Sequence, residues 1–251
     1  MRIGKPGPRP KGSAEVAYDT GLQSFTLESL NSAVNYHAWI RDMVTPYLGD
    51  HPIEIGPGLG DYAADWLERG LQRITLSEID PARRALLDKR FGADPRVNVS
   101  DIDVLAPIDA NHSALVAINV LEHIEDHVGA LRSAHRLLRP GGAVVMFVPA
   151  FPFAMSRFDL SVGHVRRYRL RTLREAYAAA GLRLERIHHV NAPGLPAWFV
   201  GMRLLKMTPQ DGTTVQLWDR YVIPVARKVE EKRNPPFGQS IFAVGRVGGS
   251  A

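Results

Sequence analysis

The amino-acid sequence predicts a doubly wound α/β fold, in which a mainly parallel sheet carries helices on both faces. Two observations predict it. Short apolar or β-rich segments alternate with amphipathic helical segments through most of the 251 residues, and parallel strands need helical crossover connections of this kind. A glycine-rich turn, Gly-Pro-Gly-Leu-Gly at residues 56–60, separates a short apolar strand from the helix that follows it.

The elements of the first half follow from hydrophobic periodicity and from turn and capping residues. Apolar residues at helical spacing predict an amphipathic helix over residues 31–48, with Pro46 and Gly49 near its end. A short strand over residues 52–55 then leads into the glycine-rich turn. Beyond the turn we expect helices at residues 61–69 and 82–91 and strands at residues 73–79, 96–99 and 114–120.

The second half continues the alternation. We expect a helix at residues 127–138 that stops at Arg-Pro-Gly-Gly, a buried strand at residues 143–148, a helix at residues 172–180 and strands at residues 182–190 and 240–246. Residues 193–236 break the pattern, and we interpret them as an insertion that covers one edge of the site, not as a second domain. The predicted organisation is a flexible basic arm at residues 1–20, followed by a single domain at residues 21–251 that contains the insertion.

Composition argues against several classes of protein. The absence of cysteine excludes disulfides, thiolate zinc sites and cysteine nucleophiles, and it agrees with an expected cytoplasmic location. No apolar run approaches the roughly 20 residues of a membrane-spanning helix, and the basic N-terminus lacks the apolar stretch of a secretory signal. The net charge of +5 is scattered and is not interleaved with aromatic residues, so we expect no nucleic-acid partner. The oligomeric state, including a homodimer, is left open.

The glycine-rich turn and an acid beyond it predict a ligand that contains a ribose. Ligands of open parallel sheets bind beyond the carboxyl ends of the strands, and glycines let the backbone approach them. The spacing Gly-x-Gly-x-Gly differs from the Gly-x-Gly-x-x-Gly of dinucleotide-binding proteins. Glu78 follows the next strand, 18 residues after Gly60, where a carboxylate can accept hydrogen bonds from both ribose hydroxyls. Asp80 is the alternative, although it directly precedes Pro81 and can instead cap the following helix.

Four segments together resemble the class I methyltransferases that use S-adenosylmethionine. They are Glu-Ile-Gly-Pro-Gly-Leu-Gly at residues 54–60, Ser-Glu-Ile-Asp at 77–80, Asn-Val-Leu-Glu-His-Ile-Glu-Asp at 119–126 and Leu-Arg-Pro-Gly-Gly at 138–142. They occur in the order and at the spacing of that family, and the resemblance covers roughly residues 30–190. It implies S-adenosylmethionine as the cofactor. The third segment lacks the Asn-Pro-Pro-Tyr of adenine and glutamine N-methyltransferases, which argues against those acceptors.

The resemblance also implies roles for individual residues of the cofactor site. Glu54 would contact the methionine amino group, directly or through water, while Glu78 would bind the ribose. Either Asp101 or Asp103 would receive the adenine amino group, although acids at a strand end are as often simply solvated. The full set of expected cofactor-binding residues is Tyr36, Glu54, Gly56, Gly58, Gly60, Glu78, Ile79, Asp101, Ile102, Asp103, Asn119 and Val120.

Residues 163–168, Gly-His-Val-Arg-Arg-Tyr, resemble a branch of this family associated with small-molecule or sugar-linked acceptors. Methyl transfer to a hydroxyl requires loss of a proton, and histidine is the commonest base near neutral pH. His164 is the first candidate for this base and His123 the second. The residues expected to bind the acceptor are Asp159, Arg166, Arg167 and Tyr168. The alternative is that hydrogen bonds and salt bridges of these residues only fix the loop.

The predicted function is S-adenosylmethionine-dependent O-methylation of a hydroxyl on a small molecule, a sugar or a glycolipid. N- or C-methylation of a small metabolite is the second hypothesis, and a non-catalytic module that binds S-adenosylmethionine is the third. The glycine spacing and the lack of a Tyr-x-x-x-Lys pair disfavour a nicotinamide-dependent oxidoreductase. His188 and His189 are adjacent in a predicted strand and point to opposite faces, so we expect no metal site.

Overall fold

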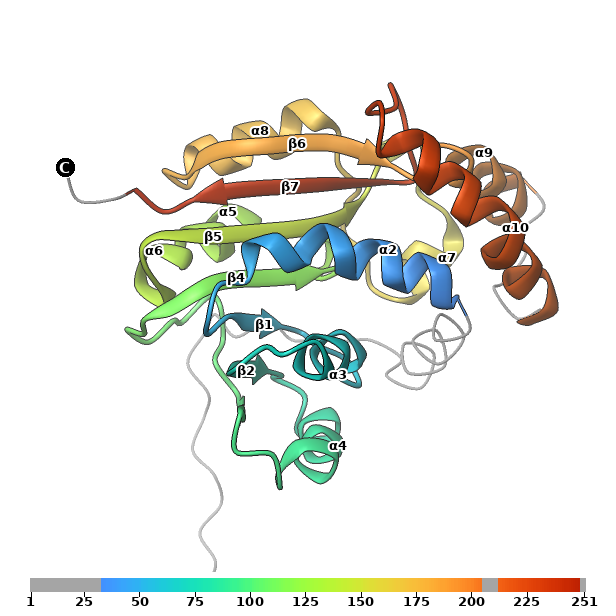
Figure 1. Cartoon of the computed structure of the whole chain (residues 1–251). Coiled ribbons are helices and arrows are strands. Elements are labelled where there is room, and N and C mark those ends of the chain that lie inside the picture. Colours follow the sequence, from blue (N-terminus) through green and yellow to red (C-terminus); the bar gives the residue numbers. More distant parts are fainter. Residues whose placement is uncertain (1–32, 205–211, 249–251) are drawn as a thin grey trace, which may run out of the picture.

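The computed structural model describes residues 33–204 and 212–248, and it forms a seven-stranded sheet (Figure 1). The strand order is β3-β2-β1-β4-β5-β7-β6, and the pairings are parallel except for the two made by β7. The strands are β1 (Ile53–Ile55), β2 (Ile74–Ser77), β3 (Val97–Ser100), β4 (His112–Ile118), β5 (Leu138–Pro149), β6 (Arg183–Val190) and β7 (Ser240–Arg246). The basic arm predicted at residues 1–20 lies outside the described residues.

Helices cover both faces of the sheet, which confirms the predicted doubly wound architecture. One face carries α2 (Val34–Val44), α3 (Asp61–Glu68), α4 (Pro81–Phe91) and α10 (Gly212–Glu230). The other carries α5 (His127–Arg132), α6 (Ala134–Leu137) and α8 (Leu170–Ala179). Because successive strand residues point to opposite faces, Met146 of β5 packs into one core and its neighbour Phe147 into the other.

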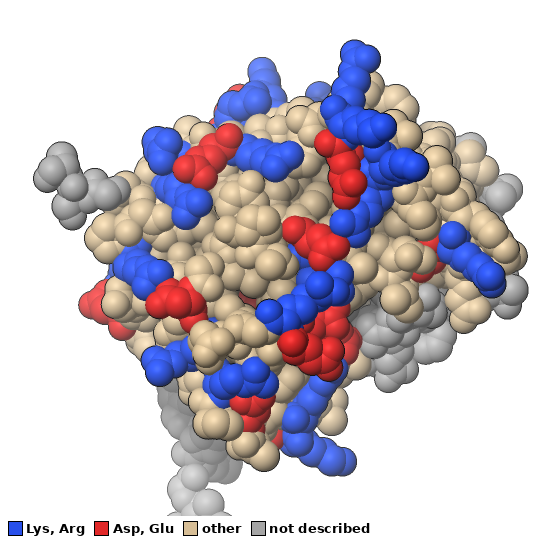
Figure 2. Space-filling view, viewed as in Figure 1, with Lys and Arg blue, Asp and Glu red and all other residues tan. Residues whose placement is uncertain are grey.

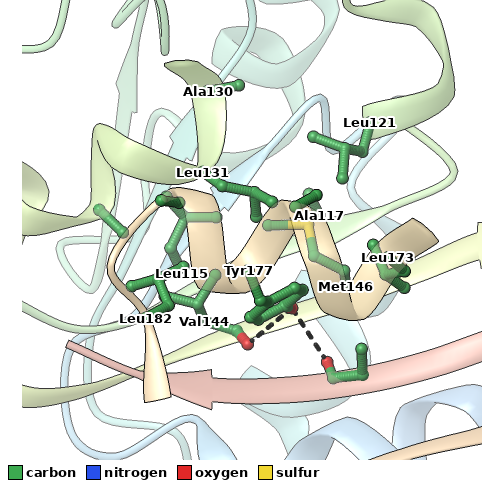
Figure 3. Close-up of a cluster of buried hydrophobic side chains, with 14 of the residues drawn as sticks. Leu115, Ala117, Leu121, Ala130, Leu131, Val144, Met146, Leu173, Tyr177 and Leu182 are labelled. Atoms are coloured by element: carbon green, nitrogen blue, oxygen red, sulfur yellow. Dashed lines mark hydrogen bonds between the residues drawn. The ribbon is translucent and has the colours of Figure 1, made fainter. Parts of the chain in front are cut away.

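The core beneath α5 and α8 is built around Tyr177 (Figure 3). Its buried hydroxyl lies 3.2 Å from the carbonyl oxygen of Val144 and 3.4 Å from that of Ala243, so it contacts two neighbouring strands. Leu131, Met146 and other apolar side chains surround the ring. The polar tip of the tyrosine is therefore partnered inside an otherwise apolar layer.

Residues 193–236 contain helices whose bounds are not predicted from the sequence. They are α9 (Gly194–Trp198), a π-helical segment (Phe199–Leu204) and the 19-residue α10. Tertiary contacts override the local effect of Pro224 within α10. The buried carboxylate of Asp219 in α10 accepts hydrogen bonds from the backbone of Asn35 and Tyr36, and it thereby caps the start of α2.

Two smaller differences concern helix boundaries. The helix predicted at residues 127–138 is divided at Ser133, whose hydroxyl donates to the carbonyl of Ala130. The short helix α7 (Arg157–Ser161) was not predicted, and a capping box formed by Ser156 and Asp159 begins it.

The site lies at the edge where β1, β2 and β4 end. The arrowheads of β1 and β4 point to this edge in Figure 1, and α7 and α9 lie beyond it. On the face shown in Figure 2, Lys and Arg side chains are interspersed with Asp and Glu. Among the described helices, none has the length and apolar character needed to cross a membrane.

Substitution of Leu131 by Ala tests the core shown in Figure 3. The side chain is fully buried, so Leu131→Ala is expected to lower the free energy of unfolding by about 2–5 kcal/mol. Leu86→Ala, at a position 52% exposed on α4, is the matched control and is expected to change it by less than about 1 kcal/mol. Urea unfolding measures both values, and equal losses in the two variants would contradict the assigned core.

Candidate cofactor and acceptor site

The glycine-rich turn places backbone where no side chain fits. Gly56 follows β1 with φ +61°, and its amide donates to the carbonyl of Ser77 at the end of β2. A Cβ atom on Gly56 would lie 2.9 Å from Cγ2 of Val120, which follows β4. Gly58 and Gly60 also have positive φ, and a Cβ atom on Gly60 would lie 2.5 Å from the ring of Phe91. The turn is therefore packed closely against Val120 and Phe91, and its backbone conformation requires glycine.

Glu54 is a buried acid with one unsatisfied oxygen. It lies in the middle of β1 and is 2% exposed, and its Oε2 has no hydrogen-bond partner among the described residues. Burial raises the pKa of Glu54 to about 8, and the negative charge of Asp61 adds to the rise. A buried carboxylate of this kind is stabilised by a cation, so the position fits the ammonium group of an amino acid.

Glu78 fits the predicted ribose position better than Asp80 does. It comes directly after β2, is 4% exposed, and its Oε1 accepts a hydrogen bond from the amide of Asp80 at 3.0 Å. Burial raises the pKa of Glu78, whereas this hydrogen bond opposes the rise. The side chain of Asp80 instead accepts from the amide of Arg83 and caps α4. The structure thus uses Asp80 as a helix cap, the alternative that the sequence left open.

The predicted adenine position contains two acids in different environments. Asp103 is half-buried, and its Oδ1 accepts from the amide of Leu105 at 2.8 Å. The side chain of Asp101 is 74% exposed and lies 3.9 Å from Arg84. The hydroxyl of Ser77 donates to the carbonyl of Ile102, the residue between the two acids, and this bond holds the backbone there against the end of β2. More of the Asp101 carboxylate is therefore available to a ligand.

Two tyrosines from α2 and α3, Tyr36 and Tyr62, lie close to each other, and Tyr62 also lies near Glu54. Tyr36, predicted to help close the pocket, packs edge-to-face against Phe147 with ring centres 6.4 Å apart. Tyr62, which sequence reasoning missed, lies in the first turn of α3 and stacks on His37 at 3.9 Å. Burial raises the pKa of Tyr62 well above its ordinary value, and the nearby Tyr36 and Glu54 add to this. An aromatic residue two positions after the last glycine of the turn was the available signal.

The segment that follows β4 is held in place by the Gly-His-Val-Arg-Arg-Tyr loop. Asn119 has φ +53°, a conformation that asparagine tolerates, and its amide donates to the carbonyl of Phe147. Arg166 donates to the carbonyls of Ile124 and Glu125. The hydroxyl of Tyr168 donates to the carbonyl of Leu121. These contacts fix residues 119–125 relative to the loop.

A buried charge network orients His164. The carboxylate of Asp159 is fully buried and accepts from Arg167 at 2.7 Å and from Nδ1 of His164 at 2.9 Å. Burial alone would raise the pKa of Asp159, but the hydrogen bond from His164 and the charge of Arg167 lower it to about 2. Arg167 also lies over the ring of Trp198 at 4.8 Å. The ionised Asp159 therefore fixes the imidazole with its Nδ1 protonated.

Beside this network lies a cluster that we name the Glu122–His123–His164 cluster. Glu122 is fully buried, and neither of its carboxylate oxygens has a hydrogen-bond partner among the described residues. Its Oε1 lies 3.7 Å from Nε2 of His164. The rings of His123 and His164 meet nearly at right angles with centres 4.7 Å apart. Sequence reasoning missed Glu122, which appeared only as part of a motif.

The ionisation of the cluster is set mainly by burial. Burial raises the pKa of Glu122 to about 7, although the nearby His164 opposes the rise. Burial also lowers the pKa of His123 to about 4, and the proximity of His164 adds to this. His123 is therefore a weak base at neutral pH. This agrees with the prediction that ranks His164 before His123 as the candidate base.

The predicted acceptor-binding residues are occupied by contacts within the protein. Asp159 and Tyr168 are at most 1% exposed, and Arg167 is 5% exposed. Their contact with an acceptor stays a prediction, and their burial favours the alternative in which they fix the loop. Arg166 is half-buried and also bonds to backbone carbonyls.

Comparisons with known proteins show similarity to methyltransferases. Residues 53–146 match a family model described as a methyltransferase domain. A Mycolicibacterium smegmatis protein, described by its name as a probable S-adenosylmethionine-dependent methyltransferase, is 29% identical over 141 residues. The match covers 55% of this chain and 53% of the relative, so the chain spans about half the length of that relative. Both matches support S-adenosylmethionine as the cofactor.

Solved structures share the architecture at low sequence identity. Geranyl diphosphate C-methyltransferase from Streptomyces coelicolor, solved with Mg²⁺, geranyl-S-thiolodiphosphate and S-adenosylhomocysteine, has a TM-score of 0.58 at 15% identity. The alignment covers 82% of this chain and 74% of that one. The fold is that of the class I methyltransferases. The [4+2]-cyclase SpnF is also similar in structure to this chain, with a TM-score of 0.57 and 20% identity, and the alignment covers 84% of this chain and 80% of SpnF.

Removal of Asp159 tests the buried charge network. Asp159→Ala leaves Arg167 buried without its carboxylate partner, so the free energy of unfolding is expected to fall by about 3–5 kcal/mol. Guanidinium unfolding measures the loss. Asp109→Ala breaks an exposed pair with Arg136 and is expected to change stability little. A small loss in Asp159→Ala, equal to that of the control, would show that the network does not hold the loop.

Proposed function

We propose that this protein is an S-adenosylmethionine-dependent methyltransferase that methylates a hydroxyl of a small-molecule, sugar or glycolipid acceptor. The observation that carries the proposal is the pairing of Glu54 with the glycine turn. A buried carboxylate with an unsatisfied oxygen lies beside backbone that cannot carry a side chain, and a second buried acid, Glu78, follows the adjacent strand. An amino-acid ammonium and a ribose diol, joined in one ligand, match this arrangement.

Each cofactor-side residue then has a physical task. The carboxylate of Glu54 pairs with the ammonium group, and Glu78 accepts hydrogen bonds from the ribose hydroxyls through the oxygen not used by Asp80. Tyr36 and Tyr62 restrict the pocket on the α2 and α3 side. The cofactor supplies an electrophilic methyl group, and the protein supplies the alignment that an in-line displacement needs.

The Glu122–His123–His164 cluster is the proposed place of proton removal. It begins two residues after Val120, which packs on Gly56, so it borders the cofactor turn. Methyl transfer to a hydroxyl releases one proton, and this cluster offers three groups that can accept hydrogen bonds or positive charge. The orientation of His164 by Asp159 supports its assignment to this step.

Aromatic side chains at the same edge support a sugar or lipid-linked acceptor. Phe151 has φ +60°, a strained conformation for a bulky residue, and it stacks on His189 at 4.9 Å. Phe153 is 51% exposed and contacts the rings of Phe151 and Phe199. Exposed aromatic surface of this kind packs well against the apolar face of a sugar or against a lipid chain.

C- or N-methylation of a small metabolite is the second candidate. The fold shared with geranyl diphosphate C-methyltransferase supports it. An amine acceptor needs alignment but no base, so variants of the cluster would then leave turnover unchanged. Transfer of a ¹³C-labelled methyl group and the chemical shift of the product identify the methylated atom.

Calorimetric titration with S-adenosylhomocysteine tests the cofactor assignment. The wild-type protein is expected to bind one molecule per chain, and Glu78→Ala is expected to weaken binding at least about tenfold because charge-assisted hydrogen bonds to the ribose are lost. Glu68→Ala, at an exposed position on α3, is the matched control and should retain wild-type affinity. NAD should produce no heat of binding. A folded protein that does not bind S-adenosylhomocysteine, or that binds NAD equally well, would contradict the proposal.

The pH dependence of this affinity tests Glu54. With a pKa of about 8, the unliganded acid is mostly protonated at pH 6, whereas pairing with an ammonium group requires its ionised form. Affinity is therefore expected to rise between pH 6 and pH 7.5, by at most about tenfold per pH unit. Titrations at several pH values should show this slope in wild type and in Glu68→Gln, and no slope in Glu54→Gln. A slope retained by Glu54→Gln would assign the proton to another group.

A further inference from the structure

We propose that Glu122, His123 and His164 bind one divalent transition-metal ion, such as Zn²⁺ or Mn²⁺. The three side chains each offer one ligand atom, and these atoms lie within 4.8 Å of one another. They come from the turn after β4 and from the loop after α7, which the contacts of Arg166 and Tyr168 hold together. From the sequence we expect no metal site, because His188 and His189 point to opposite faces of a strand, and neither of these histidines belongs to the cluster.

The carboxylate of Glu122 carries the first argument. It is fully buried, and its two oxygens have no hydrogen-bond partner within the described residues. A buried carboxylate without donors is costly unless a cation compensates it. The 3.7 Å between its Oε1 and Nε2 of His164 is longer than the roughly 2.7–2.9 Å of a charge-assisted hydrogen bond. The two groups therefore face each other across a gap that is too wide for a direct bond.

The outer contacts of the two histidines carry the second argument. Nδ1 of His164 donates to the Asp159 carboxylate at 2.9 Å, and Nδ1 of His123 donates to the carbonyl of Gly163 at 3.2 Å. A neutral imidazole has a single N–H, so donation from Nδ1 gives Nε2 the lone pair. Metal-binding histidines characteristically make this outer bond to a carboxylate or a backbone carbonyl. Both orienting groups are thus present.

The donor set selects the kind of ion. Two imidazole nitrogens and one carboxylate oxygen suit Zn²⁺, Mn²⁺ or Fe²⁺, whereas Mg²⁺ prefers oxygen ligands. Three protein ligands are also typical of catalytic sites, because they leave a coordination position for a further oxygen. Glu122 is fully buried, but the side chain of His164 is 13% exposed and His123 is half-buried. Solvent therefore reaches part of the cluster.

The use of such an ion rests on the proposed function, whereas its binding does not. An acceptor hydroxyl that coordinates the ion loses its O–H proton to solvent more readily, because the ion stabilises the alkoxide. The oxygen then forms a bond to the methyl carbon, and the carbon–sulfur bond breaks with its electron pair left on sulfur. The products are the methyl ether and S-adenosylhomocysteine. In this arrangement His164 holds the ion, and the ion rather than the imidazole promotes loss of the proton.

Calorimetric titration of the tag-free, chelator-treated full-length protein with Zn²⁺, Mn²⁺ and Mg²⁺ tests the site. We expect one Zn²⁺ or Mn²⁺ per chain and no Mg²⁺. Glu122→Gln and His164→Asn should each weaken binding at least about tenfold. Glu125→Gln, at an exposed glutamate three residues further on, is the matched control and should bind as wild type. The melting temperature should rise with Zn²⁺ in wild type and in the control, but not in the two cluster variants.

Failure of the site is recognised separately from failure of the proposed function. Absence of Zn²⁺ and Mn²⁺ binding to folded wild type, or undiminished binding by Glu122→Gln, would overturn the metal site. If a cluster variant does not fold, X-ray absorption of the zinc-loaded wild type decides: two imidazole ligands support the site, and oxygen ligands alone overturn it. Titration with S-adenosylhomocysteine is independent of both results, because no cluster residue is a predicted cofactor contact.

Discussion

The hydrogen bonds and the ion pair of the buried Asp159 carboxylate are the interactions on which α7 and the loop that follows it depend. The carboxylate begins α7 through the capping box with Ser156, pairs with Arg167 and fixes the ring of His164. A fully buried carboxylate is stable only when its oxygens are satisfied, and here both are. Arg167 in turn packs on Trp198 of α9, so one charge pair links two helices beyond the edge of the sheet.

Two other buried acids show the opposite condition, in which carboxylate oxygens are left without hydrogen-bond partners. Glu54 and Glu122 each have an unpartnered oxygen among the described residues, and burial raises the pKa of both. Val120 lies between them along the chain and contacts the glycine turn. Two buried carboxylates without full hydrogen bonding thus lie along one sheet edge. An ammonium group would compensate the charge of Glu54, and a metal ion would compensate the charge of Glu122.

The sequence predicted the local structure around the candidate site. The turn at residues 56–60, the acid at Glu78 and the cap at Asp80 each follow from the residues next to them in the chain. The same holds for the sheet, because the alternation of apolar strands and amphipathic helices is a local pattern.

The parts that the sequence did not predict depend on contacts between distant segments. The isolation of Glu122 follows from the loop that folds over it, about 40 residues later in the chain, as the bond from the Val165 amide to the Glu122 carbonyl shows. Helix α10 was not predicted, because Pro224 disfavours a helix when only the local sequence is considered. In the structure, Ile223 of this helix is buried in the core and Asp219 caps α2, and these tertiary contacts stabilise the helix. The occupation of Arg167 by Asp159 likewise requires the folded loop.

The central claim is that one ligand lies along Glu54 and Glu78 with its reactive end toward the Glu122–His123–His164 cluster. A crystal structure of the protein with S-adenosylhomocysteine tests it most directly. The account predicts the amino group within hydrogen-bond distance of Glu54, the ribose hydroxyls on Glu78, and the sulfur on the side of the cluster. A ligand bound with its sulfur directed away from the cluster, or bound outside the edge formed by β1, β2 and β4, would contradict it.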